Sequence, residues 1–312
     1  MSIRLSGLPG VRRRGLGGHL PALTASLAFF AAGASSTEGA SPTLYGVTST
    51  QLVTVDPATG TSTVVGSLGL AGNQSPGPLA WNPQDNRLYG FVYDFAIVGF
   101  DVVFTEQRFV SINPDTAAVT SIATFGSQQT GIVYDSLEYI GGSVGSLVVG
   151  RGTSGGNSGT TELATISTLG VPSTFRSTTL DNDLLAWAGD SRVISIDPNH
   201  VTPASRAREL DIQNAPPTQT FLTGSLPSST TGELAWDLTG GRLYALDYTL
   251  GNRSLYRLSV SGSALSLDST VTVSGSQVRG IAFAQVPEPA PVTAAGGLTL
   301  LAWAIRRRLQ TR

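Results

Sequence analysis

The chain of 312 residues contains no cysteine and no lysine, and it has only two histidines. The lack of cysteine excludes disulfide bonds, thiolate metal sites and cysteine nucleophiles, and the lack of lysine excludes Schiff-base chemistry. Charged residues make up only 13% of the chain, against roughly 25% in an average globular protein. Since no segment has the pattern of a long amphipathic helix, while β-branched residues and glycine-containing turns are frequent, we expect one large all-β domain.

The basic residues are all arginine, and they are unevenly distributed. Eight of them lie near the two ends of the chain, at Arg4, Arg12, Arg13, Arg14, Arg306, Arg307, Arg308 and Arg312. The remaining eleven arginines face 21 acidic residues, so an acidic body lies between two basic ends. An acidic body argues against nucleic acid as a partner, because nucleic-acid binding needs a basic surface.

The N-terminal segment has the organisation of an export signal. Residues 1–19 contain arginines and no acid, and the apolar segment LPALTASLAFFAAGA follows from Leu20 to Ala34. Ala32 and Ala34 provide the small residues that signal peptidase requires, so residues 1–34 are predicted to be a signal peptide cleaved after Ala34. A buried helix of the domain is the alternative. The residues around Arg12 and Arg13 fit a twin-arginine signal poorly, which favours general secretion.

The C-terminal segment combines three features in order. Pro287, Glu288 and Pro289 favour an extended, accessible backbone, because proline prevents a regular helix. An apolar stretch of 14 residues follows, from Val292 to Ile305. As a helix it would span ~21 Å, which is short of the ~30 Å hydrocarbon core, so it would hold the protein in a membrane only marginally. The cluster Arg306, Arg307 and Arg308 would keep its end on the cytoplasmic side.

This combination resembles a PEP-CTERM sorting signal over residues 286–312. The resemblance implies recognition by an exosortase, a membrane cysteine protease or transpeptidase of Gram-negative bacteria. It further implies a transient membrane contact, removal of the tail, and delivery to the cell surface or to an exopolysaccharide-rich matrix. A permanent C-terminal membrane anchor is the alternative interpretation.

Between the two ends, three short elements recur. The first has an apolar, a small or β-branched, and an aromatic residue. It occurs at Leu79-Ala80-Trp81, Ile132-Val133-Tyr134, Leu185-Ala186-Trp187, Leu234-Ala235-Trp236 and Ile281-Ala282-Phe283. The second is the strand-like pattern of residues 86–94 and 241–248, with weaker copies at 191–198 and 146–150. The third is a predicted hairpin, seen at 51–69, 108–126 and 254–273, with turns that begin at Asp56-Pro57 and Asn113-Pro114.

Four strands for every ~50 residues predict the blades of a β-propeller. The first repeat, from residue 43, lacks its first element, and the last element, at 280–284, has no blade after it. Placing this last strand beside the first repeat would close a ring of five blades over residues 41–285. Six or seven irregular blades, a large β-sandwich and a β-solenoid are the alternatives. The body also resembles the propeller-like repeat domains that often carry PEP-CTERM tails.

The body offers little that indicates an enzyme. His200 lies in a polar turn after Asp197-Pro198, where an exposed position is expected, so neither a Ser-His-Asp triad nor a histidine metal site is predicted. A pair of carboxylates near the channel could still act as in a glycosidase, and we expect most acids to be solvated instead. The candidates for such a pair are Asp94, Asp101, Asp135, Glu138, Asp181, Asp183, Asp237 and Asp247.

Three further features have simple explanations. Asp181, Asn182 and Asp183 provide clustered oxygens but lack the spacing of a dedicated calcium loop. Residues 150–161 are rich in Gly and Ser and predict a flexible loop between strands. Trp81, Trp187 and Trp236 recur at one position of the repeat, which indicates core packing rather than sugar stacking, and Trp303 belongs to the tail.

The sequence therefore predicts an exported surface or matrix protein without a cofactor or resident metal. Signal peptidase and an exosortase would process it, and its propeller would be a binding or structural module for a polysaccharide or protein ligand. A secreted hydrolase or lyase that uses carboxylates, and a permanently anchored structural protein, are the alternatives.

Overall fold

The computed structural model describes residues 42–98, 101–126, 132–142, 144–153, 162–177, 184–197, 207–224, 231–247 and 253–284. The predicted signal peptide and the predicted sorting signal lie outside these residues. The described residues contain twenty β-strands and no helix. The strands are β1 (Thr43–Val47), β2 (Gln51–Val55), β3 (Ser62–Ser67), β4 (Gln74–Asn82), β5 (Arg87–Val98), β6 (Asp101–Ile112), β7 (Val119–Phe125), β8 (Ile132–Ile140), β9 (Ser146–Thr153), β10 (Glu162–Ile166), β11 (Pro172–Ser177), β12 (Leu184–Trp187), β13 (Arg192–Ile196), β14 (Ala207–Asp211), β15 (Thr218–Phe221), β16 (Thr231–Asp237), β17 (Arg242–Asp247), β18 (Ser254–Ser261), β19 (Ala264–Thr272) and β20 (Gly280–Ala284).

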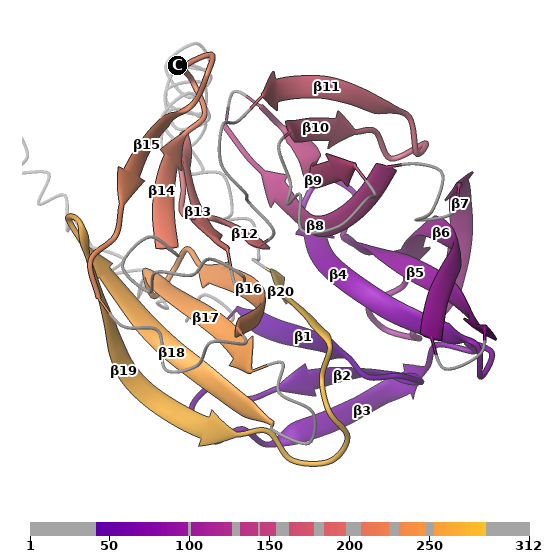
Figure 1. Ribbon diagram of the computed structural model, residues 1–312. Helices are drawn as coiled ribbons and strands as arrows, with labels where there is room; N and C mark the ends of the chain where they lie inside the picture. The colour runs from indigo at the N-terminus through magenta and orange to yellow at the C-terminus, as the bar shows by residue number, and fades with distance from the viewer. Residues whose placement is uncertain are drawn as a thin grey trace, which may run out of the picture. The chain divides into compact units, whose positions relative to one another are not determined.

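The strands form five antiparallel sheets of four strands each, arranged as blades around a ring (Figure 1). Blade 1 has the order β20-β1-β2-β3, and blades 2 to 5 are β4–β7, β8–β11, β12–β15 and β16–β19. In every blade the first strand of the order lies near the centre of the ring and the last lies at the periphery (Figure 1). The prediction of an all-β propeller with five blades is confirmed.

Blade 1 is built from both ends of the repeat region. β20 pairs antiparallel with β1, in a register that places Phe283 opposite Leu44 and Ile281 opposite Gly46. The missing inner strand of the first repeat is thus supplied by the last strand, as predicted. This pairing closes the ring, so the inner edge of β1 is covered and β20 belongs to a complete blade.

The predicted hairpin turns have the expected geometry. The Asp56 carboxylate accepts the Ala58 N–H at 2.8 Å, and Gly60 ends the turn at a φ of 73°. The Asn113 side chain accepts neighbouring backbone N–H groups in the same way, and Ala117 takes the position of Gly60 at a φ of 61°. These side chains satisfy backbone donors that the strands leave unpaired, which fixes where each outer hairpin reverses.

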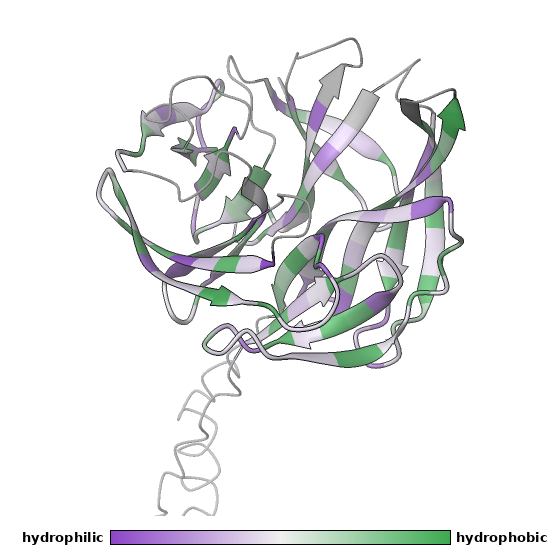
Figure 2. Cartoon of the chain, turned by 60° about the horizontal axis from the view of Figure 1, so that its bottom comes forward, coloured by the Kyte–Doolittle hydropathy of each residue, from purple (hydrophilic) through white to green (hydrophobic). Residues whose placement is uncertain are grey.

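The blades pack face to face through their apolar side chains. Along the strands, apolar and polar residues alternate, as Figure 2 shows by the change of colour from residue to residue. Between blades 2 and 3, the rings of Phe91 and Tyr134 stack at 5.2 Å, and Phe109 lies 5.5 Å from Phe91. Fully burying an aromatic or aliphatic side chain contributes about 1.5–3 kcal/mol, so these interfaces hold the ring together.

Blade 4 also buries an ion pair. An Arg208 Nη2 atom lies 3.4 Å from Asp197 Oδ2, and both side chains are almost fully buried. The Arg208 guanidinium lies 5.9 Å from the centre of the Phe221 ring. A buried pair of this kind is costly to break, because one charge would remain in an apolar surrounding.

The Gly/Ser-rich segment that was predicted to be a loop is partly a strand. Residues 150–153 of the Gly/Ser-rich segment continue β9 and form no loop, since they pair with β8 and β10. Residues 154–161 lie outside the described residues.

Within the ranges that the structure describes, no helix is long and apolar enough to cross a membrane.

Candidate functional site at the centre of the ring

The inner strands β4, β8, β12, β16 and β20 surround the centre of the ring. Each pairs with a neighbour on one side only, and they contact one another in the order β20, β4, β8, β12, β16 and back to β20. Their second edges therefore carry backbone groups that no strand pairs. In β12, for example, the Ala188 N–H points outward to Arg192 O, so the preceding Trp187 N–H points to the free edge.

The charges on these inner strands have one sign. β4, β12 and β20 contain no ionisable residue, whereas β8 contains Asp135 and Glu138, and β16 contains Glu233 and Asp237. None of the five strands contains arginine or histidine. Asp237 lies at the end of β16, where its carboxylate accepts the N–H groups of Thr239 and Gly240 in a turn. The other three acids are Asp135 and Glu138 on β8 and Glu233 on β16.

The register of blade 3 shows why Glu138 is unusual. Tyr139 pairs with Leu147, as Trp81 pairs with Leu88 in blade 2. Tyr139 is thus the aromatic residue of the repeat, and the predicted match of Tyr134 to the tryptophans is wrong. A register shift between Tyr134 and Ser136 in β8 separates the two tyrosines. Glu138 therefore occupies the position at which the other four inner strands have alanine, namely Ala80, Ala186, Ala235 and Ala282.

The Glu138 carboxyl is held at the free edges of two inner strands. Its Oε1 atom accepts the Tyr139 N–H at 3.1 Å, and the Trp187 N–H of β12 also donates to this carboxyl. Burial raises the pKa of Glu138 from 4.5 to about 8, although the two N–H donors act in the opposite direction. Burial thus favours the protonated form of Glu138, whose carboxyl accepts N–H groups from blades 3 and 4.

Glu233 lies on β16, in a blade that is not adjacent to blade 3. Glu233 is only 9% exposed, and no hydrogen-bond or ion-pair partner for its carboxyl occurs among the described residues. Burial raises its pKa well above the ordinary value of 4.5, and the charges of Asp135 and Glu138 raise it further. β12 lies between β8 and β16 in the ring, so the charges that act on Glu233 come from a strand beyond blade 4.

The other acids proposed from the sequence have structural roles or lie outside the description. Asp94 pairs with Arg108 at 2.9 Å, and Asp247 accepts the Tyr256 hydroxyl at 2.7 Å in the interior. Asp101 begins β6, and its side chain is outside the described residues. Asp181, Asn182, Asp183 and His200 are also outside them. Among the proposed acids with described side chains, Asp135 and Glu138 both raise the pKa of Glu233, a residue that the sequence analysis did not single out.

The acids that the structure describes form no cluster that could hold a metal ion. In the described part of the chain, no three His, Asp or Glu residues lie close enough together to hold one. Direct ligation of Ca²⁺ requires six to eight oxygen atoms at 2.3–2.6 Å, as a general rule. Asp135, Glu138 and Glu233 therefore do not form such a shell.

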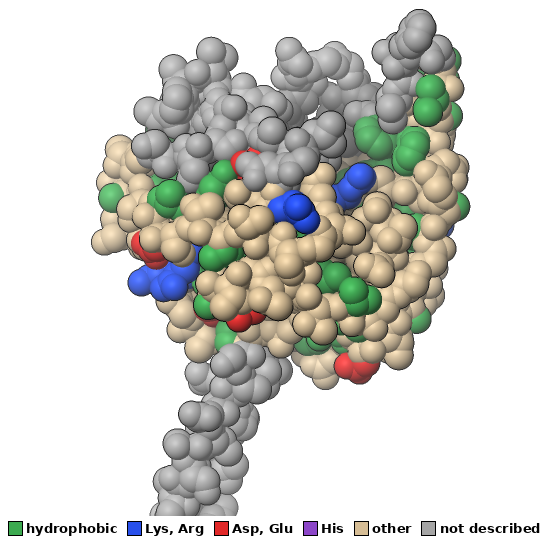
Figure 3. Space-filling view, turned by 90° about the horizontal axis from the view of Figure 1, so that it is seen from below, with side chains coloured by type: hydrophobic (Ala, Val, Ile, Leu, Met, Phe, Trp, Pro, Cys, Tyr) green, Lys and Arg blue, Asp and Glu red, His purple; other side chains and the backbone are tan. Residues whose placement is uncertain are grey.

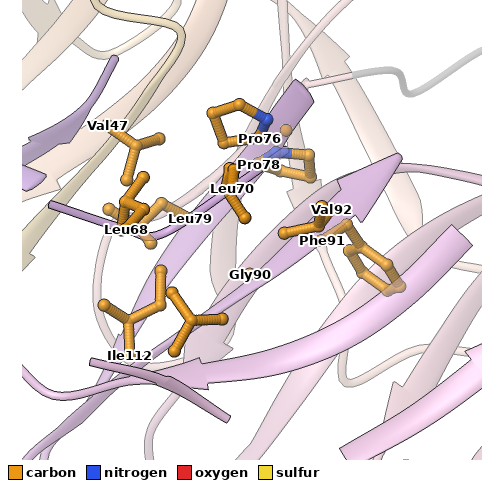
Figure 4. Close-up of a pocket in the computed structure, with 12 residues that line it drawn as sticks. Val47, Leu68, Leu70, Pro76, Pro78, Leu79, Gly90, Phe91, Val92 and Ile112 are labelled. Atoms are coloured by element: carbon orange, nitrogen blue, oxygen red, sulfur yellow. The ribbon is translucent and has the colours of Figure 1, made fainter. Parts of the chain in front are cut away.

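Three hollows elsewhere offer less chemistry. A void of about 10 Å³ between blades 1 and 2 is lined by apolar residues such as Leu68, Leu79 and Phe91 (Figure 4). It is too small and too apolar for an ordered water with polar partners. An open hollow of about 320 Å³ lies between blades 3 and 4, where Arg176 covers the Phe175 ring at 4.4 Å and donates to backbone carbonyls. Its guanidinium is thus engaged in holding the blades together.

A third hollow, of about 440 Å³, is shallow and lies on blade 2 around the Asp94–Arg108 ion pair. On the face seen in Figure 3, the charged side chains of the described residues are few, and an acidic and a basic group lie side by side at its left edge. The Asp94 carboxylate of this hollow thus already has a basic partner.

The recurring tryptophans pack as predicted. Trp236 is 8% exposed in the interface of blades 4 and 5. Trp81 stacks on Tyr45 at 6.3 Å, and Trp187 meets Tyr139 edge-on and donates its Nε1–H to Asp190 O. Trp303 lies outside the described residues. The three indoles of the body therefore belong to the packing between blades.

Comparisons with known proteins assign no family to the chain. No family model and no curated protein matches the chain. Among solved structures, the chain is similar to a chain of a nidogen/laminin complex, with 12% identity over 78% of this chain and 99% of that one, at a TM-score of 0.44. It is similar to regucalcin, a calcium-binding protein of Agrobacterium tumefaciens, with 12% identity over 68% and 78% of the two chains and a TM-score of 0.42.

A third similar structure is an oligogalacturonate lyase in complex with manganese, with 13% identity over 72% of this chain and 61% of that one, at a TM-score of 0.39. The names of these three proteins describe different activities. The similarity therefore assigns no function to this chain, and the function has to be argued from its own residues.

Proposed function

We propose that the chain is an exported protein of the bacterial cell surface or exopolysaccharide matrix, whose propeller is a binding module. The observation that carries this proposal is the position of the ring-closing strand. β20 ends at Ala284, and every described strand precedes Val286. A processing enzyme could thus remove residues 286–312 without taking a strand from the ring, as a sorting signal requires.

The proposal includes the processing steps predicted from the two ends of the chain. Signal peptidase cleaves after Ala34, the tail contacts the inner membrane transiently, and an exosortase recognises Pro287, Glu288 and Pro289. Arg306, Arg307 and Arg308 stop the tail at the cytoplasmic side. The released or attached propeller then presents its blades to a polysaccharide or protein of the matrix.

Mass spectrometry of terminal peptides from the native protein tests this proposal, in cells with and without their exosortase. We expect an N-terminus near Ser35 and the loss of peptides beyond Pro289 only when the enzyme is present. Glu288→Ala should abolish this loss, whereas Gln285→Ala, just outside the motif, should leave it unchanged. Persistence of peptides that end at Arg312 in the mature wild-type protein would contradict the proposal and indicate a permanent anchor.

The acids at the centre of the ring favour a second candidate, a secreted hydrolase or lyase that uses carboxyl groups. A carboxyl with a pKa of about 8 keeps its proton at neutral pH, as Glu138 does, and can donate it to a leaving group. Release of reducing ends from a panel of polysaccharides tests this candidate. If Glu138 is the acid, Glu138→Gln should reduce the rate at least ~100-fold, and equal rates would exclude this role.

A further inference from the structure

The hairpin of β5 and β6 in blade 2 extends beyond the rest of its sheet. β4 begins opposite Asp94 of β5, and β7 ends opposite Gln107 of β6. β5 and β6 continue to pair with each other as far as Val98 and Asp101. The end of this hairpin is therefore a ribbon of two strands, to which no other described strand is added on either side. A ribbon of this kind is only marginally stable in water by itself.

The end of β5 is apolar on both faces of this ribbon. Phe95 and Ile97 lie on one face, and Ala96 and Val98 lie on the other, because successive side chains of a strand alternate. The side chains nearest the tip are also the most exposed, since Ile97 is 72% and Val98 is 62% exposed. Exposed apolar surface gathered at the end of a hairpin favours contact with a partner.

The outer edge of β5 also has a backbone group without a partner. The Phe95 N–H donates to Asn73 O at 2.9 Å, just before β4 begins. The Ile97 N–H points to the same side, because backbone groups alternate along a strand, and it makes no backbone hydrogen bond among the described residues. Proline or charged side chains usually protect such an edge, and β11, for example, begins with Pro172. The end of β5 has neither.

We propose that this edge of β5 pairs with the same edge of a second copy of the chain. In an antiparallel pair with its two-fold axis at Ile97, the two copies of this residue exchange both of their N–H···O bonds. Each copy then extends the sheet of the other at the point where β4 has ended. Because residues 95–98 carry no charge, the two identical strands meet without like-charge repulsion. This self-association goes beyond the proposed function and does not depend on sorting.

A second copy fits this ribbon better than a lipid surface does. An open strand edge cannot enter hydrocarbon without leaving its N–H and C=O groups unsatisfied, at a cost of several kcal/mol for each group. Pairing between two copies satisfies these groups and covers the apolar side chains in the same contact. The paired segment is short, so the interface should be smaller than about 1,200 Å² and the dimer should be weak. It would be populated where copies are crowded together, as on a surface or in a matrix.

Disulfide trapping of the full-length chain in a mild detergent tests the pairing, since the natural chain has no cysteine that could interfere. Ile97→Cys places one thiol of each copy at the two-fold axis, where paired Cα atoms are about 5.5 Å apart and a disulfide can form. With copper phenanthroline as the oxidant, Ile97→Cys should give at least ~10-fold more disulfide-linked dimer than Leu169→Cys, because thiols held apart cannot be bridged. Leu169 is a matched control, since it is 78% exposed between β10 and β11.

Sedimentation velocity over a range of concentrations measures the same contact without a crosslink. The wild type should shift from monomer toward dimer as the concentration increases. Ile97→Lys should remain monomeric, because a charge at the edge of a strand opposes pairing. Val171→Lys is the control, since Val171 is also exposed, at 63%, but lies on another hairpin, and it should follow the wild type.

Three outcomes would overturn the inference. These are equal amounts of disulfide dimer from Ile97→Cys and Leu169→Cys, equal association of Ile97→Lys and wild type, and insertion of the hairpin into lipid. Insertion would be seen when spin-labelled lipid chains quench a fluorophore on the thiol of Ile97→Cys and no disulfide dimer forms. Trapping of Ile97→Cys decides the matter if circular dichroism shows that Ile97→Lys is not folded. Mapping of terminal peptides separates this test from that of sorting, because the tail can be processed whether or not the hairpins pair.

Discussion

Replacing Glu138 by glutamine should make the stability of the propeller less dependent on pH. The amide keeps an oxygen that can accept the Tyr139 N–H, which Glu138 accepts at 3.1 Å, but it removes the titration. The folded wild type holds its Glu138 proton up to a pKa of about 8, whereas the unfolded chain loses it near 4.5. The folded state thus binds more protons between these values, and the free energy of unfolding falls as the pH rises through this window.

The size of the effect follows from the same two values. A pKa that rises from 4.5 to about 8 on folding corresponds to about 5 kcal/mol as an upper limit, at about 1.4 kcal/mol for each pKa unit. The cost of ionising Glu138 in the folded protein lowers the free energy of unfolding by its full amount above about pH 8 and not at all below pH 4.5. Glu233 acts in the same direction, so Glu138→Gln should remove part of the pH dependence, and the double variant with Glu233→Gln should remove more.

Urea unfolding at pH 5, 7 and 9 measures this effect. We expect wild type and Glu138→Gln to differ by at most ~1 kcal/mol at pH 5, because both provide a hydrogen-bond acceptor there. At pH 9 the variant should be more stable than wild type by a few kcal/mol, and Asp237→Asn should follow the wild-type profile. Parallel pH profiles of wild type and Glu138→Gln would refute the conclusion that burial holds the Glu138 proton.

Three further predictions concern the ring itself and can be measured by urea unfolding. Phe283→Ala should cost about 3–5 kcal/mol, because this buried ring belongs to the strand that closes blade 1, and an unchanged midpoint would contradict that role. Arg208→Ala should cost about 3–5 kcal/mol by leaving its buried carboxylate partner without the ion pair, whereas a cost below about 1 kcal/mol would show that the pair contributes little. Gly141→Ala should cost about 1–3 kcal/mol and shift the Trp187 fluorescence, because a Cβ there would meet the indole. As a control, Gly72→Ala, where a Cβ would lie in open space, should change stability by no more than about 0.5 kcal/mol.

The sequence was sufficient for the architecture because each blade repeats the same local chemistry. The hairpin turns at Asp56 and Asn113 could be recognised from residue types alone, and the structure places both as predicted. The unpaired last element at 280–284 was sufficient to predict the closure with β1. These features are local or repeat at a fixed spacing, so no knowledge of distant contacts was needed.

Blade 3 shows where such a comparison fails. The match to Ile132-Val133-Tyr134 follows residue type, but the shift in β8 places Leu137, Glu138 and Tyr139 in register with the other repeats. The glutamate at the alanine position made the true repeat harder to recognise. When the five inner strands are aligned by the residue that each aromatic residue pairs with, Glu138 stands where the other four strands have alanine.

The burial of Glu233 could not be inferred from its neighbours in the sequence. It precedes Leu234-Ala235-Trp236 and would ordinarily be assigned to a strand end exposed to water. Its environment depends on β8, which is almost a hundred residues earlier and lies beyond blade 4 in the ring. The pKa of Glu233 is raised by burial and further by Asp135 and Glu138, so it is a property of the closed ring.

The closing strand also determines when the protein can finish folding. β1 is synthesised more than two hundred residues before β20, so its inner edge stays open while the other four blades form. An open strand edge of this kind can pair with another chain and start aggregation. Contacts between residues so far apart in the sequence also form slowly. The nascent propeller is thus most vulnerable until residue 284 has been made, and a chaperone that covers β1 during this interval would protect the whole ring.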